Sequence, residues 1–144
     1  MLLTREFDYG LRVIRSLADG EKKSGAEICS TEILPVSYGY KILKKLENAG
    51  ILLSTRGQYG GYQLAKSLEN ITLYDIILAL NESFLVFQCL EDRTMCPFLS
   101  ENRPCGFHIE FQRIQDMLVE GMREKSMYDL VKNEKTIRRQ CKVS

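Results

Sequence analysis

Residues 37–65 read SYGYKILKKLENAGILLSTRGQYGGYQLA, and the periodicity of the apolar residues changes halfway along this stretch. In the first half, apolar residues recur at the spacing of one helix face: Ile42, Leu43 and Leu46. Ser37 is placed to cap the start of that helix, and Gly50 follows its end. The first half therefore predicts a helix over residues 37–49 whose apolar face is turned inward.

In the second half of the stretch the pattern changes from the helical period to a period of two, most clearly where Tyr62 and Leu64 flank Gln63. An alternating pattern is typical of a β-strand with one buried face. Strands are predicted at 51–55 and 62–65, and the glycine-rich residues 57–61 form the turn between them. The second half is therefore interpreted as a β-hairpin.

Two more helices are predicted upstream of residue 37. Residues 4–18 have apolar residues at helical spacing after Thr4, a possible N-cap. Ser24 and Glu27 have the spacing of a capping box, which predicts a second, short helix, and Pro35 interrupts the chain before the third. Three helices followed by a hairpin make a winged helix-turn-helix, with the third helix as the recognition helix and the hairpin as the wing.

The distribution of charge supports binding to a polyanion. The whole chain carries 20 Lys and Arg against 19 Asp and Glu, but residues 1–66 carry ten basic and seven acidic side chains. The candidate DNA contacts are polar or basic side chains on the third helix and the wing: Ser37, Tyr38, Tyr40, Lys41, Lys44, Lys45, Arg56 and Gln58. Arg56 lies beside glycines, so its guanidinium could enter a narrow minor groove. The alternative is an ordinary solvated surface.

The second half of the chain is also predicted to be helical. A fourth helix covers roughly 72–82, a long one runs from about 106 to 125, and a short one follows. The long helix has a heptad-like seam: Phe107, Phe111, Ile114, Leu118 and Gly121. Two heptads are too few for a stable isolated coiled coil, so this seam needs a partner. The predicted fold is mostly α, a winged helix-turn-helix domain with a β-hairpin wing plus a long dimerisation helix.

Four parts of the chain follow from these patterns. They are a DNA-binding domain at 1–82, a cysteine-rich loop at 83–105, a dimerisation helix with a short following helix at 106–130, and a C-terminal tail at 131–144. The loop holds three of the five cysteines, spaced Cys89-x₆-Cys96-x₈-Cys105. Three thiolates suit an iron–sulfur cluster, zinc or Cu(I), but the short C-x₂₋₄-C spacing usual for structural zinc is absent. Cys29 is interpreted as a core residue and Cys141 as incidental.

Several segments together resemble a known family of regulators. They are LTREFDYGLR at 3–12, LKKLENAGIL at 43–52, the wing STRGQYGGYQLA at 54–65 and the three downstream cysteines. They are similar to the winged helix-turn-helix regulators typified by the iron–sulfur regulator IscR and the nitric-oxide-sensitive repressor NsrR. The resemblance implies a homodimer that binds an imperfect palindromic operator in double-stranded DNA. It also implies that Cys89, Cys96 and Cys105 hold an iron–sulfur cluster, although the gaps between them are longer than is usual in the family.

Two residues are candidates for a fourth cluster ligand. Asp8 matches the position where NsrR-type members provide a carboxylate from the other subunit, and it would fit a 4Fe–4S cluster, which we favour. His108, the only histidine of the chain, lies three residues after Cys105 and would fit a 2Fe–2S cluster. Either ligand would make the site more labile than four thiolates would, as suits a sensor.

The predicted function is therefore a cytoplasmic transcriptional regulator, a repressor or a dual regulator. Its cluster would act as a redox sensor, or would sense nitric oxide or iron supply. The alternative is a cluster-free regulator whose cysteines form a thiol switch or a zinc site and which responds to a partner protein or small molecule. No phosphate loop, GxSxG or HExxH motif is present, so no enzyme is predicted. No apolar run approaches the ~20 residues of a membrane span, and no membrane partner is expected.

Overall fold

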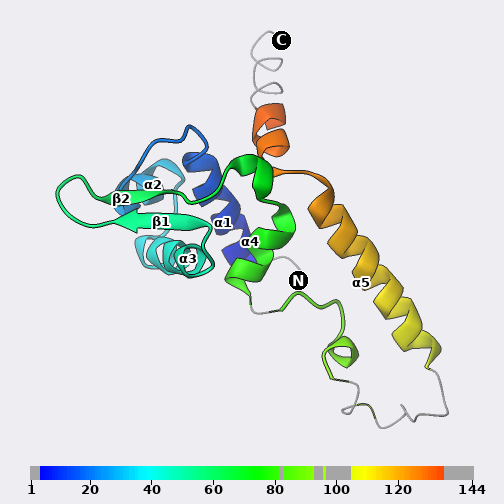
Figure 1. The fold of residues 1–144 in the computed structure, drawn as a ribbon. Coiled ribbons are helices and arrows are strands. Elements are labelled where there is room, and N and C mark those ends of the chain that lie inside the picture. Colours follow the sequence, from blue (N-terminus) through cyan, green and yellow to red (C-terminus); the bar gives the residue numbers. More distant parts are fainter. Residues whose placement is uncertain (1–3, 82, 93–95, 97–104, 135–144) are drawn as a thin grey trace.

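The computed structural model describes residues 4–81, 83–92, 96 and 105–134. The described chain is mostly helical with one two-stranded antiparallel hairpin, which confirms the predicted fold class. Figure 1 shows α4 between the N-terminal helices and α5, with the hairpin extending away from the helices on the opposite side from α5. Among the described residues, no helix combines the length and the apolar character needed to cross a membrane.

The first two helices start where their capping residues predict. Helix α1 (Arg5–Ser16) follows Thr4, whose hydroxyl accepts a hydrogen bond from the backbone N–H of Phe7 at 3.4 Å. Helix α2 (Gly25–Thr31) follows Ser24, whose hydroxyl accepts from the N–H of Glu27 at 3.1 Å. These bonds satisfy donors that the first turn of a helix leaves unpaired.

Helix α3 (Val36–Asn48) begins earlier than predicted. Pro35 is its N-cap, with φ −58° and ψ 128°, and Ser37 is already the second helical residue. The prediction that Ser37 caps this helix is therefore wrong. Proline fixes φ near the helical value, so the chain turns into the helix directly after it. The Pro35 carbonyl accepts the first helical bond, from Gly39, at 2.8 Å.

The wing forms close to its predicted limits. Strand β1 (Leu52–Thr55) pairs with strand β2 (Gly61–Leu64), with Leu52 opposite Leu64 and Thr55 opposite Gly61. An isolated bridge adds Lys23, which exchanges two backbone hydrogen bonds with Tyr62 at 2.7 and 3.0 Å. The bridge ties the base of the wing to the segment between α1 and α2.

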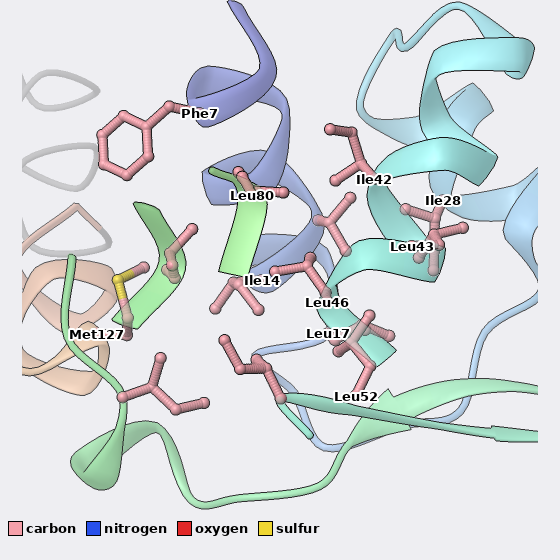
Figure 2. Packing of buried hydrophobic residues seen from close by; sticks show 14 of the residues in the cluster. Phe7, Ile14, Leu17, Ile28, Ile42, Leu43, Leu46, Leu52, Leu80 and Met127 are labelled. Atoms are coloured by element: carbon pink, nitrogen blue, oxygen red, sulfur yellow. The ribbon is translucent and has the colours of Figure 1, made fainter. Parts of the chain in front are cut away.

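A single hydrophobic core joins the helices of the first half to the wing. Its fully buried side chains come from α1, α2, α3, α4 (Leu73–Leu80) and β1, and Figure 2 shows them meeting between these elements: Ile14, Leu17, Ile28, Ile42, Leu43, Leu46 and Leu52 among them. Helix α4 begins with a complete capping box between Thr72 and Asp75 after the short helix η1 (Leu68–Asn70). The apolar faces predicted for the four helices are therefore the faces that form this core.

The chain after α4 packs more loosely. It continues through the short helix η2 (Gln88–Leu90), helix α5 (Gly106–Glu124) and a final helix over residues 127–134. This last helix returns to the core, because Met127 is buried and its N–H bonds to the Ile71 carbonyl at 2.7 Å. The division of the chain at residues 82, 105 and 130 stays a prediction.

Candidate nucleic-acid interface and cysteine segment

The outward face of α3 carries most of the candidate DNA contacts. Helix α3 buries one side in the core, so residues on the opposite side point to solvent. The exposed candidates on this helix are hydroxyl-bearing or basic: Ser37, Tyr38, Tyr40, Lys41 and Lys44. Phosphates and base edges are hydrogen-bonded by side chains of these types, so the face is chemically suited to a DNA groove.

Two glycines let α2 and α3 approach each other closely. A Cβ added to Gly39 would lie 2.2 Å from the sulfur of Cys29, and one added to Gly25 would lie 2.6 Å from the ring of Tyr40. Cys29 is buried, which confirms its interpretation as a core residue, and burial raises the pKa of its thiol. Any larger residue at Gly39 would push the recognition helix away from α2.

The lysines of the recognition helix are paired with carboxylates that the sequence pattern did not reveal. Lys41 lies 2.6 Å from Glu6 of α1, and Lys44 lies 2.9 Å from Glu47 of its own helix. The Glu47 carboxylate also accepts a hydrogen bond from Ser54 of β1. The spacing of three between Lys44 and Glu47 could have indicated their pair, whereas Glu6 and Lys41 are 35 positions apart.

Lys45 has different surroundings from the other two lysines. Its ammonium donates to Glu6 at 2.7 Å and to the Leu80 carbonyl at the end of α4, also at 2.7 Å. Its side chain is about one third exposed, whereas that of Lys41 is more than half exposed. These contacts favour a structural role for Lys45, and its role in DNA binding stays a prediction.

The tip of the wing presents a guanidinium, an amide and an aromatic ring to solvent. Arg56, Gln58 and Tyr59 are all exposed, and Tyr59 is 85% exposed. The turn is tight, since Gly57 has φ +104° and a Cβ on Gly60 would lie 2.3 Å from the Thr55 carbonyl oxygen. Tyr59 was not among the predicted contacts, although an aromatic residue between turn glycines could have drawn attention to it.

The three loop cysteines are free thiols that the described chain does not bring together. Cys89 lies in η2, Cys105 is the N-cap residue of α5, and all three loop cysteines are half-buried. Within residues 4–81, 83–92, 96 and 105–134, no group of three or more Cys, His, Asp or Glu side chains is placed to hold a metal ion. The shared site therefore stays a prediction, and Cys141 lies outside the described residues.

The two candidate fourth ligands have opposite environments. Asp8 is exposed on α1 and forms an ion pair with Arg12 at 2.9 Å. His108, one turn after Cys105, is only 9% exposed, and its buried Nε2 atom has no hydrogen-bond partner among the residues that the structure describes. A buried nitrogen without a partner is costly, so His108 is the candidate whose own bonding is incomplete.

The predicted seam of α5 divides between two faces. Phe111 stacks on Phe87 with ring centroids 4.5 Å apart, and Leu118 packs against the core. Phe107 and Gly121 instead face solvent, and Phe107 is 78% exposed. The sequence pattern did not predict that Gln115 is buried. Its side chain accepts a hydrogen bond from the Val86 N–H at 2.8 Å and donates one to the Phe84 carbonyl at 2.7 Å.

Most of the chain is similar in sequence to known proteins. The model of the Rrf2 family, described as iron-dependent transcriptional regulators, matches residues 3–133. Protein aau3 of Rhizobium meliloti is 30% identical over 135 residues, which cover 92% of this chain and 86% of that protein. Protein rrf2 of Nitratidesulfovibrio vulgaris is 34% identical over 100 residues, which cover 67% of each chain.

Solved structures show the same fold. CymR, the global cysteine regulator of B. subtilis, superposes with a TM-score of 0.71 at 26% identity, covering 90% of this chain and 95% of that one. The oxidized form of Staphylococcus aureus CymR gives a TM-score of 0.67 at 26% identity, with 91% and 96% covered. T. potens IscR gives 0.71 at 22% identity, with 91% and 86% covered. The chain therefore belongs to the Rrf2 family of winged helix-turn-helix transcriptional regulators and is not an enzyme.

Proposed function

We propose that this Rrf2-family regulator binds a palindromic operator as a homodimer and that an iron–sulfur cluster on its three loop cysteines controls the binding. The observation that carries the DNA-binding part is the exposed polar face of α3, held rigidly on α2 beside a tight wing. Two copies related by a two-fold axis present two recognition helices, which a palindromic duplex matches with two half-sites. Repression or dual regulation would follow from where the operator lies.

On DNA, the side chains divide by chemistry. Ser37, Tyr40 and Lys44 are exposed on α3 and can contact base edges or phosphates in the major groove. Arg56 at the wing tip can enter the adjacent minor groove, with Gln58 beside it. Because phosphate contacts are electrostatic, the affinity should fall steeply with salt concentration.

The homodimer is supported by α5. Three of its apolar residues are largely exposed, Phe107 at 78%, Ile109 at 60% and Met117 at 58%, and the half-buried Ile114 lies two turns from Phe107 on the same side of the helix. The two buried residues of this helix, His108 and Gln115, are polar. A helix that turns large apolar side chains to solvent gains from a second copy of itself, which covers them.

The cluster is supported by the donor chemistry of the segment. Cys89, Cys96 and Cys105 are free and half-buried, and the buried Nε2 of His108 lacks a partner one turn from Cys105. Three thiolates and one imidazole, or one carboxylate from Asp8 of the second subunit, form a donor set that iron–sulfur clusters accept. When bound, the cluster would supply thiolate-held iron that reacts with oxidants or nitric oxide.

A binding comparison of protein with and without cluster tests the proposal. Duplexes are first selected from a random pool by protein purified without oxygen, and their affinities are then measured for cluster-loaded and cluster-free protein. We expect the two forms to differ in affinity or in the sequences they prefer. Equal affinity and equal preference would contradict control by a cluster, and absence of any selected duplex would contradict DNA binding.

A thiol switch without a cluster is the second candidate. It is favoured by the similarity to S. aureus CymR, for which an oxidized form has been solved, and by the free state of Cys29, Cys89, Cys96 and Cys105. Zinc held by the loop cysteines is a variant of this candidate. Metal and sulfide analysis separates these candidates. Iron with sulfide supports the cluster, and zinc alone supports the zinc variant. Protein that contains neither metal supports the thiol switch.

A further inference from the structure

We propose that Glu6 weakens the hold of the recognition helix on DNA phosphates, because its carboxylate competes with them for Lys41. The inference rests on the proposed DNA binding through α3. It assigns a role to a residue outside the recognition helix and the wing. Glu6 thereby favours sequence-specific sites over non-specific ones, since it lowers the part of the affinity that any duplex would provide.

The geometry gives one carboxylate two lysine partners. Its Oε1 atom lies 2.6 Å from the Lys41 ammonium, and its Oε2 atom lies 2.7 Å from the Lys45 ammonium. The Glu6 side chain is only 20% exposed, so the lysines and α1 shield it from water. These hydrogen bonds hold the pKa of Glu6 below its usual value, and the carboxylate keeps its charge at neutral pH.

The two lysines are not equivalent in this arrangement. Lys45 is also bonded to the Leu80 carbonyl at 2.7 Å and fixes Glu6 against α4. Lys41 is more exposed and forms an ion pair with Glu6. A phosphate that approaches α3 can reach Lys41 only by displacing Glu6 or by sharing the ammonium with it. Glu6 therefore occupies in free protein the place that a phosphate oxygen would take.

The position of Glu6 also connects the DNA-binding surface with the candidate sensor. Glu6 lies in the first turn of α1 together with Asp8, the candidate trans ligand. Leu80 lies at the end of α4, just before the segment that leads to Cys89. A change in either segment would shift Glu6 relative to Lys41 and so change how available Lys41 is to DNA.

The test measures binding to a short random-sequence duplex over a range of salt concentrations, so it needs no known operator. Glu6→Gln keeps the size and polarity of the side chain but removes its charge. Glu6→Gln should release one lysine of each subunit to phosphate, so for the dimer the affinity should rise about tenfold or more and the log–log salt slope should steepen by about 1.8. Glu69→Gln, an exposed glutamate of η1, is the matched control for net charge.

A second pair of variants shows whether the effect passes through Lys41. In a Lys41→Met background, Glu6→Gln should no longer change the affinity or the salt slope. Lys41→Met alone should lower the slope by much less than one full phosphate contact, because Glu6 already neutralises Lys41. This single variant leaves Glu6 in place, so the inference stays testable even if Glu6→Gln unfolds.

Three results would overturn the inference. Glu6→Gln could bind no more tightly than Glu69→Gln, or its effect could persist without Lys41, or Lys41→Met alone could remove a full phosphate contact. Any of these leaves the proposed DNA binding intact. If the wild-type protein and every variant fail to bind any duplex at low salt, the proposed function fails and the inference fails with it.

Discussion

The chain up to Phe84 and the chain from Cys105 onward place their apolar side chains differently. The first part gathers them in one core, and Ile14, Ile42 and Leu46 are fully buried there. In the second part, Met127 is the only hydrophobic residue that is buried among the described ones. Helix α5 buries polar residues and exposes Phe107. The first part therefore forms most of the core within one chain, whereas the second part adds Met127 to it and leaves Phe107, Ile109 and Met117 largely exposed.

This difference fits the functions that we propose for the two parts, DNA binding for the first and sensing with dimerisation for the second. A DNA-reading surface must hold its side chains in fixed positions, and a rigid core beneath α3 provides that. The sensing and dimerising role that we propose for the second part requires it to change with a signal, and elements held by few contacts change most easily. Helix α5 attaches to the preceding chain through the Gln115 hydrogen bonds to the backbone at residues 84–86, the stacking of Phe111 on Phe87 and the packing of Leu118.

The largest effect is expected from a substitution that weakens the core of the first part. Leu46→Ala should lower the free energy of unfolding by about 3 kcal/mol, because it leaves a cavity at a fully buried position between α3, α1 and β1. Urea unfolding followed by far-UV circular dichroism measures this. A loss below about 1 kcal/mol would mean that the core is less tightly packed than the structure shows.

The next largest effect should come from the exposed face of α5. Met117→Lys places a charge among the apolar side chains that we assign to the dimer contact, so the dissociation constant should rise at least about tenfold. Sedimentation equilibrium measures it, and the helical signal should be unchanged. Gln112→Lys, on another side of the same helix, is the matched control. Equal effects of the two variants would contradict the assigned face.

A smaller and opposite effect is expected in the turn between α2 and α3. Ile33 has φ +55°, which is unfavourable for a β-branched residue, and it is 83% exposed, so little packing depends on it. Ile33→Asn should raise the free energy of unfolding by about 1 kcal/mol, because Asn tolerates this conformation. Ile33→Val keeps the branch and should bring no gain. Thermal unfolding of the three proteins decides this.

The smallest expected effect concerns an ion pair at the base of the wing. Lys23 lies 2.6 Å from Asp19, and this hydrogen bond lowers the pKa of Asp19 below its ordinary 3.8. A lowered folded-state pKa stabilises the protein above the unfolded value, and the gain disappears as pH falls through the folded value. Asp19→Asn should therefore cost roughly 0.5 kcal/mol at pH 7 and nothing near pH 2.

The urea midpoints of wild type and Asp19→Asn, measured from pH 7 down to about pH 2, test whether the difference in stability disappears as the pH falls. A difference between them that grows as the pH falls would contradict it. The side-chain pair of Lys23 and Asp19 would then not stabilise the folded protein at neutral pH.

The sequence allowed the first part to be predicted well because its signals are local. Period, capping residues and turn glycines lie within a few positions of each other, and they placed α1, α2, α4 and the hairpin to within a few residues. The start of α3 was misplaced because Pro35 and Ser37 are both plausible starting points. The strained φ of Ile33 could not be foreseen, since Gly or Asn usually occupies such a position.

The candidate site was harder to predict because its contacts are distant in sequence. Glu6 meets Lys45 across 39 positions, and nothing in either segment indicates the pairing. The inward turn of His108 and Gln115 was also unforeseen, because the apolar seam of α5 suggested a different buried face. The shared site of Cys89, Cys96 and Cys105 stays a prediction, because the described residues do not bring three such side chains together.

Native mass spectrometry of protein purified without oxygen tests whether the protein is a homodimer that carries an iron–sulfur cluster, because one spectrum reports both the partner and the cofactor. We expect a dimer at twice the chain mass of 16.6 kDa plus the mass of an iron–sulfur cluster for each chain. Cys105→Ser should remove the added mass, and Met117→Lys should shift the population toward the monomer. A bare monomer that gains no mass on incubation with iron and sulfide would contradict the account.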